Sequence, residues 1–206
     1  MSGFTIDFSE LDNIRESAGA TKSQMIGAFN RALKRTAAKL QRESVAMMIA
    51  ETGIRGKPKK RVKSFVENAG KEGGDPGSGK IWFGLNDVQV SGLKGRMKSP
   101  KGIAIADRKR DARGRFEKEN GSRGATFIPA NKNLHPTTFL NSFVGTVRGR
   151  KSIWIRGSSG RHVNEASLPI YKPMLSGVEV ISDEAGELLM KYYEQDLRGR
   201  VAGGVK

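Results

Sequence analysis

Residues 74–80, Gly-Asp-Pro-Gly-Ser-Gly-Lys, have the spacing of a phosphate-binding loop, G-x-x-x-x-G-K. Such a loop follows a strand, opens a helix whose N-terminus holds the phosphate, and carries Ser or Thr after the lysine to bind Mg²⁺. Here a polar, glycine-rich linker precedes the motif, Ile81 follows the lysine, and the next pattern is that of a strand. The segment therefore favours a glycine-rich hinge over a nucleotide site.

The two histidines are the next residues that could do chemistry. His135 and His162 are 27 residues apart in loop-like sequence, and the chain has no cysteine. Neither belongs to a His-x-x-x-His or His-Glu pair, which argues against a metal site. A triad of His162, Glu165 and a nearby serine is conceivable, but ordinary loop composition explains these residues better. No pair of carboxylates suited to hydrolysis can be picked out. We therefore expect no enzymatic activity, no metal and no cofactor.

Positive charge is the strongest indication of function. Lys and Arg number 37 against 21 Asp and Glu, a formal net charge of +16. The excess lies in three windows: residues 55–63 with six basic and no acidic residues, 94–118 with ten and three, and 148–161 with five and none. The rest of the chain has a net charge of −2. Basic segments on a nearly neutral framework predict a polyanion nearby.

No helix-turn-helix, zinc-finger or ribonucleoprotein motif is visible, so any DNA would be met through its phosphates and without sequence readout. Trp82, Phe83 and Trp154 lie inside apolar runs, which favours a core or interface role over base stacking. The contacts that we expect with DNA or an acidic partner are Arg55, Lys57, Lys59, Lys60, Arg61, Lys63, Arg108, Lys109, Arg110, Arg113 and Arg115.

Helical patterns lie at both ends of the chain. Thr21 and Gln24 have the spacing of a capping box, and the apolar face that follows predicts a helix of about 30 residues ending at Gly53. We interpret its basic stripe (Arg31, Arg35, Lys39 and Arg42) as a solvated face, or else as a face turned toward an acidic neighbour or nucleic acid. A second helix is predicted from the N-cap Ser182 to Gly199, with a short tail at 201–206.

Strand patterns fill most of the middle of the chain. Alternating apolar residues predict strands near residues 4–8, 81–83, 88–90, 103–105, 126–129, 139–147, 153–155 and 178–181. Brief helices are predicted near Leu11 and Ile14 and over residues 55–68, a flexible linker at 69–79 and a mobile loop at 107–124. Segregated helices and strands predict an α+β fold, in which a long N-terminal amphipathic helix packs on a mainly antiparallel sheet and a C-terminal helix follows. We expect one domain over 1–206, with a flexible basic insert at about 69–124.

Bulk composition sets further bounds. Hydrophobic residues make up 36% of the chain, so the core is expected to be modest or completed by other subunits. The lack of cysteine excludes disulfides. No apolar run reaches the roughly 20 residues needed to span a bilayer, and the first residues lack the pattern of a signal peptide. We expect the chain to be made in a reducing cytoplasm and to meet no membrane.

Several segments, taken in order, resemble one protein family. They are Phe29–Leu33 and Glu51–Arg55, the basic stretch Lys57–Lys63, and then Gly124–Ile128, Ile153–Arg156 and Leu168–Ile170. Together, over about residues 20–200, they resemble the minor tail protein Z family of tailed bacteriophages, also called tail completion proteins. The glycine- and arginine-rich segment 69–124 departs from the family's pattern.

The resemblance implies a structural virion protein without enzymatic activity, acting in tail completion and head–tail joining. It implies a ring subunit at the head-proximal end of the tail, after assembly in the host cytoplasm. The implied partners are other copies of itself, tail terminator or tail tube proteins, head–tail connector proteins and genomic DNA in the lumen. The alternative is a nucleic-acid-binding accessory protein without sequence specificity. An enzyme such as a nuclease ranks last.

Overall fold

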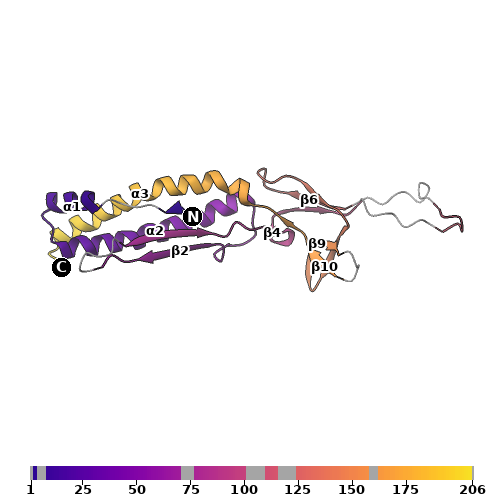
Figure 1. Ribbon diagram of the computed structural model, residues 1–206, viewed down its shortest axis with the longest axis horizontal. Helices are drawn as coiled ribbons and strands as arrows, with labels where there is room; N and C mark the ends of the chain where they lie inside the picture. Colours follow the sequence, from indigo (N-terminus) through magenta and orange to yellow (C-terminus); the bar gives the residue numbers. More distant parts are fainter. Residues whose placement is uncertain are drawn as a thin grey trace. The chain divides into compact units, whose positions relative to one another are not determined.

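The computed structural model describes residues 2–3, 8–70, 77–100, 110–115, 124–157 and 162–205. It divides into two compact units (Figure 1). Unit 1 comprises Met1–Glu51, Gly56–Leu85 and Lys172–Lys206, and unit 2 comprises Thr52–Arg55 and Asn86–Tyr171. Helices with antiparallel strands confirm the predicted α+β class. That 1–206 is a single domain stays a prediction.

Helix α2 (Lys22–Thr52) is the long element of unit 1 and begins at the predicted capping box. The Thr21 backbone N–H donates to Gln24 Oε1 at 2.9 Å, and the Gln24 N–H donates to Thr21 Oγ1 at 3.3 Å. Gly53, with φ +66°, ends the helix in the left-handed conformation that glycine adopts without strain. The shorter α1 (Phe8–Ser17) precedes it and confirms the brief helix near Leu11.

Helix α3 (Tyr171–Ala202) runs antiparallel to α2 (Figure 1). Leu189, Tyr193 and Leu197 pack with Phe29 and Leu33 of α2 in one buried cluster. The Tyr193 ring meets Phe29 edge-on at 6.3 Å, and its hydroxyl donates to the Leu11 carbonyl at 3.1 Å. Burial raises the pKa of Tyr193 to about 12; Asp12 adds to the rise and Arg15 opposes it.

The predicted strand at 178–181 is wrong, because α3 begins at Tyr171 rather than near Ser182. Met174, Val178, Ile181 and Ala185 repeat at helical spacing on one side, and a four-residue segment with three apolar residues cannot distinguish helix from strand by itself. Gly177 allows α2 to approach closely, since a Cβ there would lie 2.5 Å from Met47 Sδ. At its other end α3 continues to Ala202, past the predicted stop at Gly199.

Three antiparallel strands complete unit 1, in the order β1-β3-β2: β1 (Ser2–Gly3), β3 (Ser78–Phe83) and β2 (Val62–Glu67). The helix predicted over 55–68 is wrong. Val62, Phe65 and Val66 fit a helical period, but burial along β2 alternates at every residue, and β2 pairs with β3 over its whole length. On the inner side, Ser64 Oγ donates to Gln41 Oε1 of α2, and Asn30 exchanges two hydrogen bonds with the backbone of Ala69.

In the part of unit 2 that the structure describes, short antiparallel strands form three small sheets. Their orders are β10-β9-β8, β11-β4 and β5-β6-β7. A 3-10 turn, η1 (Val90–Gly92), follows β4. The strands are β4 (Val88–Gln89), β5 (Gly95–Lys98), β6 (Ala125–Pro129), β7 (Thr137–Phe139), β8 (Ser142–Val147), β9 (Arg150–Arg156), β10 (Val163–Glu165) and β11 (Ser167–Leu168).

Most predicted strands of unit 2 are confirmed, with two differences. The strand predicted over 139–147 is two strands, because Asn141 turns the chain with φ +53°. Within the segment expected to be a flexible insert, residues 78–98 hold β3, β4 and β5. Three predictions cannot be compared with the structure in full, because they fall on residues outside the described ones. They are the strand at 103–105, residues 4–7 of the strand at 4–8, and most of the loop at 107–124.

Candidate interaction surfaces

Two of the six basic residues of 55–63 donate to backbone carbonyls, and all but Arg61 are exposed. Arg55 Nε donates to the Leu93 carbonyl at 2.9 Å within unit 2, and Arg61 Nη1 donates to the Gly84 carbonyl at 3.0 Å within unit 1. Lys57, Lys59, Lys60 and Lys63 are exposed in unit 1. The four lysines and Arg55 are therefore the exposed polyanion contacts of this window, and the two arginines also have structural hydrogen bonds.

The second group of expected contacts is only partly described, because Arg108 and Lys109 lie outside the described residues. Arg110, Arg113 and Arg115 are exposed on one tight turn organised by Asp111. Asp111 Oδ1 accepts the backbone N–H groups of Arg113 and Arg115, each at 2.9 Å. Arg110 Nη1 donates to the Gly114 carbonyl at 2.8 Å. An aspartate that accepts backbone N–H groups two and four residues ahead thus gathers three arginines.

Charge is divided unequally between the two units. Unit 1 has 19 basic and 15 acidic residues, whereas unit 2 has 18 basic and 6 acidic ones. Unit 2 therefore carries +12 of the net +16. Two of the three basic windows, 94–118 and 148–161, lie entirely in unit 2, and the first is split between the units. Unit 2 is a small β structure with a strongly positive field.

Glu165 is an internal carboxylate of this basic unit, with its side chain 3% exposed. Its Oε1 accepts the Ser152 hydroxyl at 2.7 Å and the Ser91 backbone N–H at 3.1 Å, and Oε2 lies 3.3 Å from Arg150 Nη1. Burial acts to raise the pKa of Glu165, but the hydrogen bonds from Ser91, Ser152 and Arg150 outweigh it and lower the pKa below 4.5. Glu165 therefore joins η1, β9 and β10 as a structural carboxylate.

The outer face of the β2–β3 hairpin, which we define as Lys63, Phe65, Lys80 and Trp82, alternates lysine and aromatic side chains. Glu67 is exposed at the end of the same face, where it accepts the Ser78 hydroxyl at 3.0 Å. Lys63 is paired across the strands with Trp82, and Phe65 with Lys80. Phe65 is 53% and Trp82 39% exposed, and Lys63 Nζ lies 5.6 Å from the centroid of the Trp82 ring. Trp154 is buried, as expected of a core residue, whereas Trp82 lies on a surface, so an interface role for Trp82 stays a prediction.

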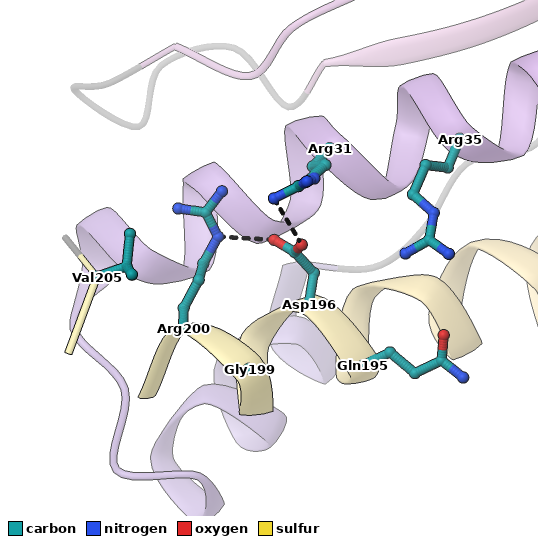
Figure 2. Close-up of a pocket in the computed structure, with 7 residues that line it drawn as sticks. All are labelled: Arg31, Arg35, Gln195, Asp196, Gly199, Arg200 and Val205. Atoms are coloured by element: carbon teal, nitrogen blue, oxygen red, sulfur yellow. Dashed lines mark hydrogen bonds and ion pairs between the residues drawn. The ribbon is translucent and has the colours of Figure 1, made fainter. Parts of the chain in front are cut away.

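A hollow of about 270 Å³ lies between α2 and α3, and three of its seven lining residues are arginines (Figure 2). Asp196 lies 2.6 Å from Arg200 Nε and 3.4 Å from Arg31 Nη1, and Arg35 lies over the Tyr192 ring. Three guanidinium groups could hold an anion, but Asp196 already supplies the carboxylate to two of them. Arg31 of the basic stripe of α2 is thus paired with an acidic residue of the same chain, Asp196 of α3. We interpret this arrangement as a contact that holds α2 and α3 together, which we call the helix-pairing contact. Gly27 makes room for it, since a Cβ there would lie 2.8 Å from Arg200 Nη1.

Both histidines are exposed. Among the described residues, no group of three or more His, Cys, Asp and Glu side chains could hold a metal ion. Glu165, the conceivable triad partner of His162, is engaged by Ser91, Ser152 and Arg150. No helix in the part of the chain that the structure describes is long and apolar enough to cross a membrane. That the chain is no enzyme stays a prediction.

Comparison of the chain with models of known protein families, with curated proteins and with solved structures finds no match. The resemblance to tail completion proteins therefore stays a prediction, and the surfaces described above carry the functional argument.

Proposed function

We propose that this chain is a structural subunit of a tailed-phage virion that acts in tail completion and head–tail joining. In this proposal it forms a ring at the head-proximal end of the tail, with genomic DNA passing through the lumen. Its partners there are other copies of itself, tail terminator or tail tube proteins and head–tail connector proteins. It is assembled in the host cytoplasm and remains in the virion.

The observation that carries the proposal is the concentration of +12 of the net +16 in unit 2. A strongly positive unit attracts DNA through phosphates without reading its sequence. Unit 1, with 19 basic and 15 acidic residues, is nearly balanced and offers surfaces for protein contacts. This division suits a subunit that holds its neighbours with one part and lines a DNA path with the other.

The test uses purified phage particles and a phage in which the gene for this chain is disrupted. We expect mass spectrometry to detect the chain in wild-type particles, and the disrupted phage to accumulate separate heads and tails. Supplying the chain in trans restores joined particles. A chain missing from purified particles, or joined infectious particles formed without it, would refute the proposal.

The exposed Lys57, Lys59 and Lys60 favour one alternative, a nucleic-acid-binding accessory protein. It predicts binding to duplex DNA in solution, with an affinity that falls steeply with salt. Each lost phosphate contact reduces the slope of log K against log salt by about 0.9. Replacing the three lysines by glutamine separates the two functions. Loss of DNA binding with normal head–tail joining favours the accessory role, and loss of joining favours the virion role.

A further inference from the structure

The outer face of β2–β3 is a surface that the fold of unit 1 leaves uncovered. Its inward neighbours Val62, Ser64 and Val66 point toward α2, so Lys63, Phe65, Lys80 and Trp82 point away from it. Two large aromatic side chains remain exposed between lysines, and Lys59 and Lys60 add charge just before β2. A paired aromatic–cation surface of this kind suits an acidic partner that also has apolar side chains.

Helix α3 of the same chain has such a surface on its N-terminal half. Residues 173–190 contain four acidic residues and no Lys or Arg. These four acidic residues are Glu179, Asp183, Glu184 and Glu187. All four side chains are exposed, and none makes an ion pair with another described residue. Together with the exposed Leu175 (41%) and Val180 (55%), they form what we define as the acidic face of α3. They lie on the side of the helix away from the buried Met174 and Ala185.

The two surfaces cannot meet within one subunit. Helix α2 contacts the inner side of the hairpin through Gln41 and contacts α3 through Met47 and Phe29. In Figure 1, α2 runs between α3 and β2. The outer face of β2–β3 and the acidic face of α3 are therefore turned away from α2 in different directions, and only a second copy can bring one against the other.

The spacing of charges on the two surfaces also agrees. Carboxylates four residues apart on a helix, such as Glu179 and Asp183, are separated by about 6 Å along the axis. Lys63 and Lys80 lie diagonally across neighbouring strands, offset by two residues along the strand, which is about 7 Å. Leu175 and Val180 can then cover Phe65 and Trp82, so that both pairs of exposed apolar side chains leave water.

We propose that the outer face of β2–β3 binds the acidic face of α3 of a second copy of this chain. A contact between two different surfaces is heterologous, so it repeats from copy to copy and gives a ring or an open chain. The inference specifies the subunit contact of the ring and rests on the proposed assembly role. Single-stranded nucleic acid, which also favours aromatic–lysine surfaces, is the competing occupant.

The test measures the mass of the full-length protein by size-exclusion chromatography with light scattering, for wild type and three variants. The first variant carries Lys63→Glu with Lys80→Glu, the second Glu179→Lys with Asp183→Lys, and the third all four changes. We expect the wild type to be oligomeric at about 50 µM, each charge reversal to weaken association at least 10-fold, and the fourfold variant to assemble again. Because every changed side chain is exposed, circular dichroism should be the same for all.

A matched control changes the same amount of charge elsewhere. Lys98→Glu with Lys132→Glu alters two exposed lysines of unit 2 and should leave the oligomer intact. The proposal is overturned by a wild type that is monomeric at about 50 µM, or by an oligomer that survives both reversals. It is overturned also if Lys63→Glu with Lys80→Glu abolishes binding of a fluorescent oligothymidylate and leaves the mass unchanged.

The outcome is separable from that of the virion proposal. If the chain is present in particles but the reversals leave its oligomer intact, the contact is wrong and the virion role survives. If the reversals and the rescue behave as expected but the chain is missing from particles, the contact is right and the virion role is wrong.

Discussion

Glu165 offers the most quantitative test of the structure, because one carboxylate holds three elements of unit 2. The Ser91 N–H and the Ser152 hydroxyl both donate to Oε1, and Ser152 is 0% exposed. Glu165→Ala leaves both donors without that acceptor. Losing hydrogen bonds to a buried charge and stranding their donors should cost about 3–5 kcal/mol. The ion pair itself adds little, since Arg150 is 57% exposed.

Glu165→Gln is the matched variant. The glutamine oxygen can still accept from Ser91 and Ser152, so only the charge and the contact with Arg150 are lost, at about 1–2 kcal/mol. The cost should depend on pH. Because the pKa of Glu165 is lowered in the folded state, its ionised form stabilises the fold above about pH 4.5. This stabilisation is lost as the pH falls through the lower folded pKa, so the difference between Glu165→Gln and wild type should shrink toward pH 3.

The two tryptophans provide the assay, because Trp82 belongs to unit 1 and Trp154 to unit 2. A Trp82→Phe background leaves Trp154, which pairs with Glu165 across β9 and β10, as the only tryptophan. Urea unfolding followed by its fluorescence reports unit 2. Lys132→Gln, at an exposed side chain of the same unit, serves as the control. The reasoning is refuted if Glu165→Ala lies within about 0.5 kcal/mol of wild type, or if alanine and glutamine cost the same.

Three further predictions concern unit 1, and Trp82 fluorescence in a Trp154→Phe background can follow each. Thr21→Ala removes the N-cap acceptor of α2 and should cost about 1 kcal/mol; Thr21→Ser should restore most of it. Tyr193→Phe removes the hydrogen bond to the Leu11 carbonyl and should cost about 1 kcal/mol. It should also remove a phenolate absorbance step near pH 12, and its persistence would contradict the buried position. Asp196→Asn leaves Arg31 and Arg200 without their shared carboxylate and should cost about 1–3 kcal/mol; an unchanged midpoint would contradict the helix-pairing contact.

The sequence predicted best those elements for which the local capping residues and the apolar pattern indicate the same structure. The Thr21–Gln24 capping box and Gly53 marked both ends of α2, because caps act within a few residues of their position. At residues 62–67 the local pattern fitted a helix, but the segment forms a strand because it pairs with β3, which comes later in the chain. At 178–181 the local pattern fitted a strand, but the segment is helical. Packing against α2 extends α3 through these residues, although three of the four are β-branched.

The candidate surfaces were less predictable than the fold. Counting charge found the basic windows but could not show that Arg55 and Arg61 hold backbone carbonyls, because those contacts are with residues 38 and 23 positions away. It also could not place Trp82 and Phe65 on one face with Lys63 and Lys80, since that face exists only once β2 and β3 are in register. The i, i+4 spacing of Glu179, Asp183 and Glu187 was present in the sequence, but it gained meaning only when α3 was seen to begin at Tyr171.

We have proposed that this chain is a ring subunit that joins head and tail around the DNA path. The decisive experiment is an electron cryomicroscopy reconstruction of the neck of purified particles. We expect density for this chain in a closed ring at the head-proximal end of the tail, with the basic residues of unit 2 facing the lumen. Density for the chain elsewhere in the particle, or a neck ring built entirely of other proteins, would contradict it.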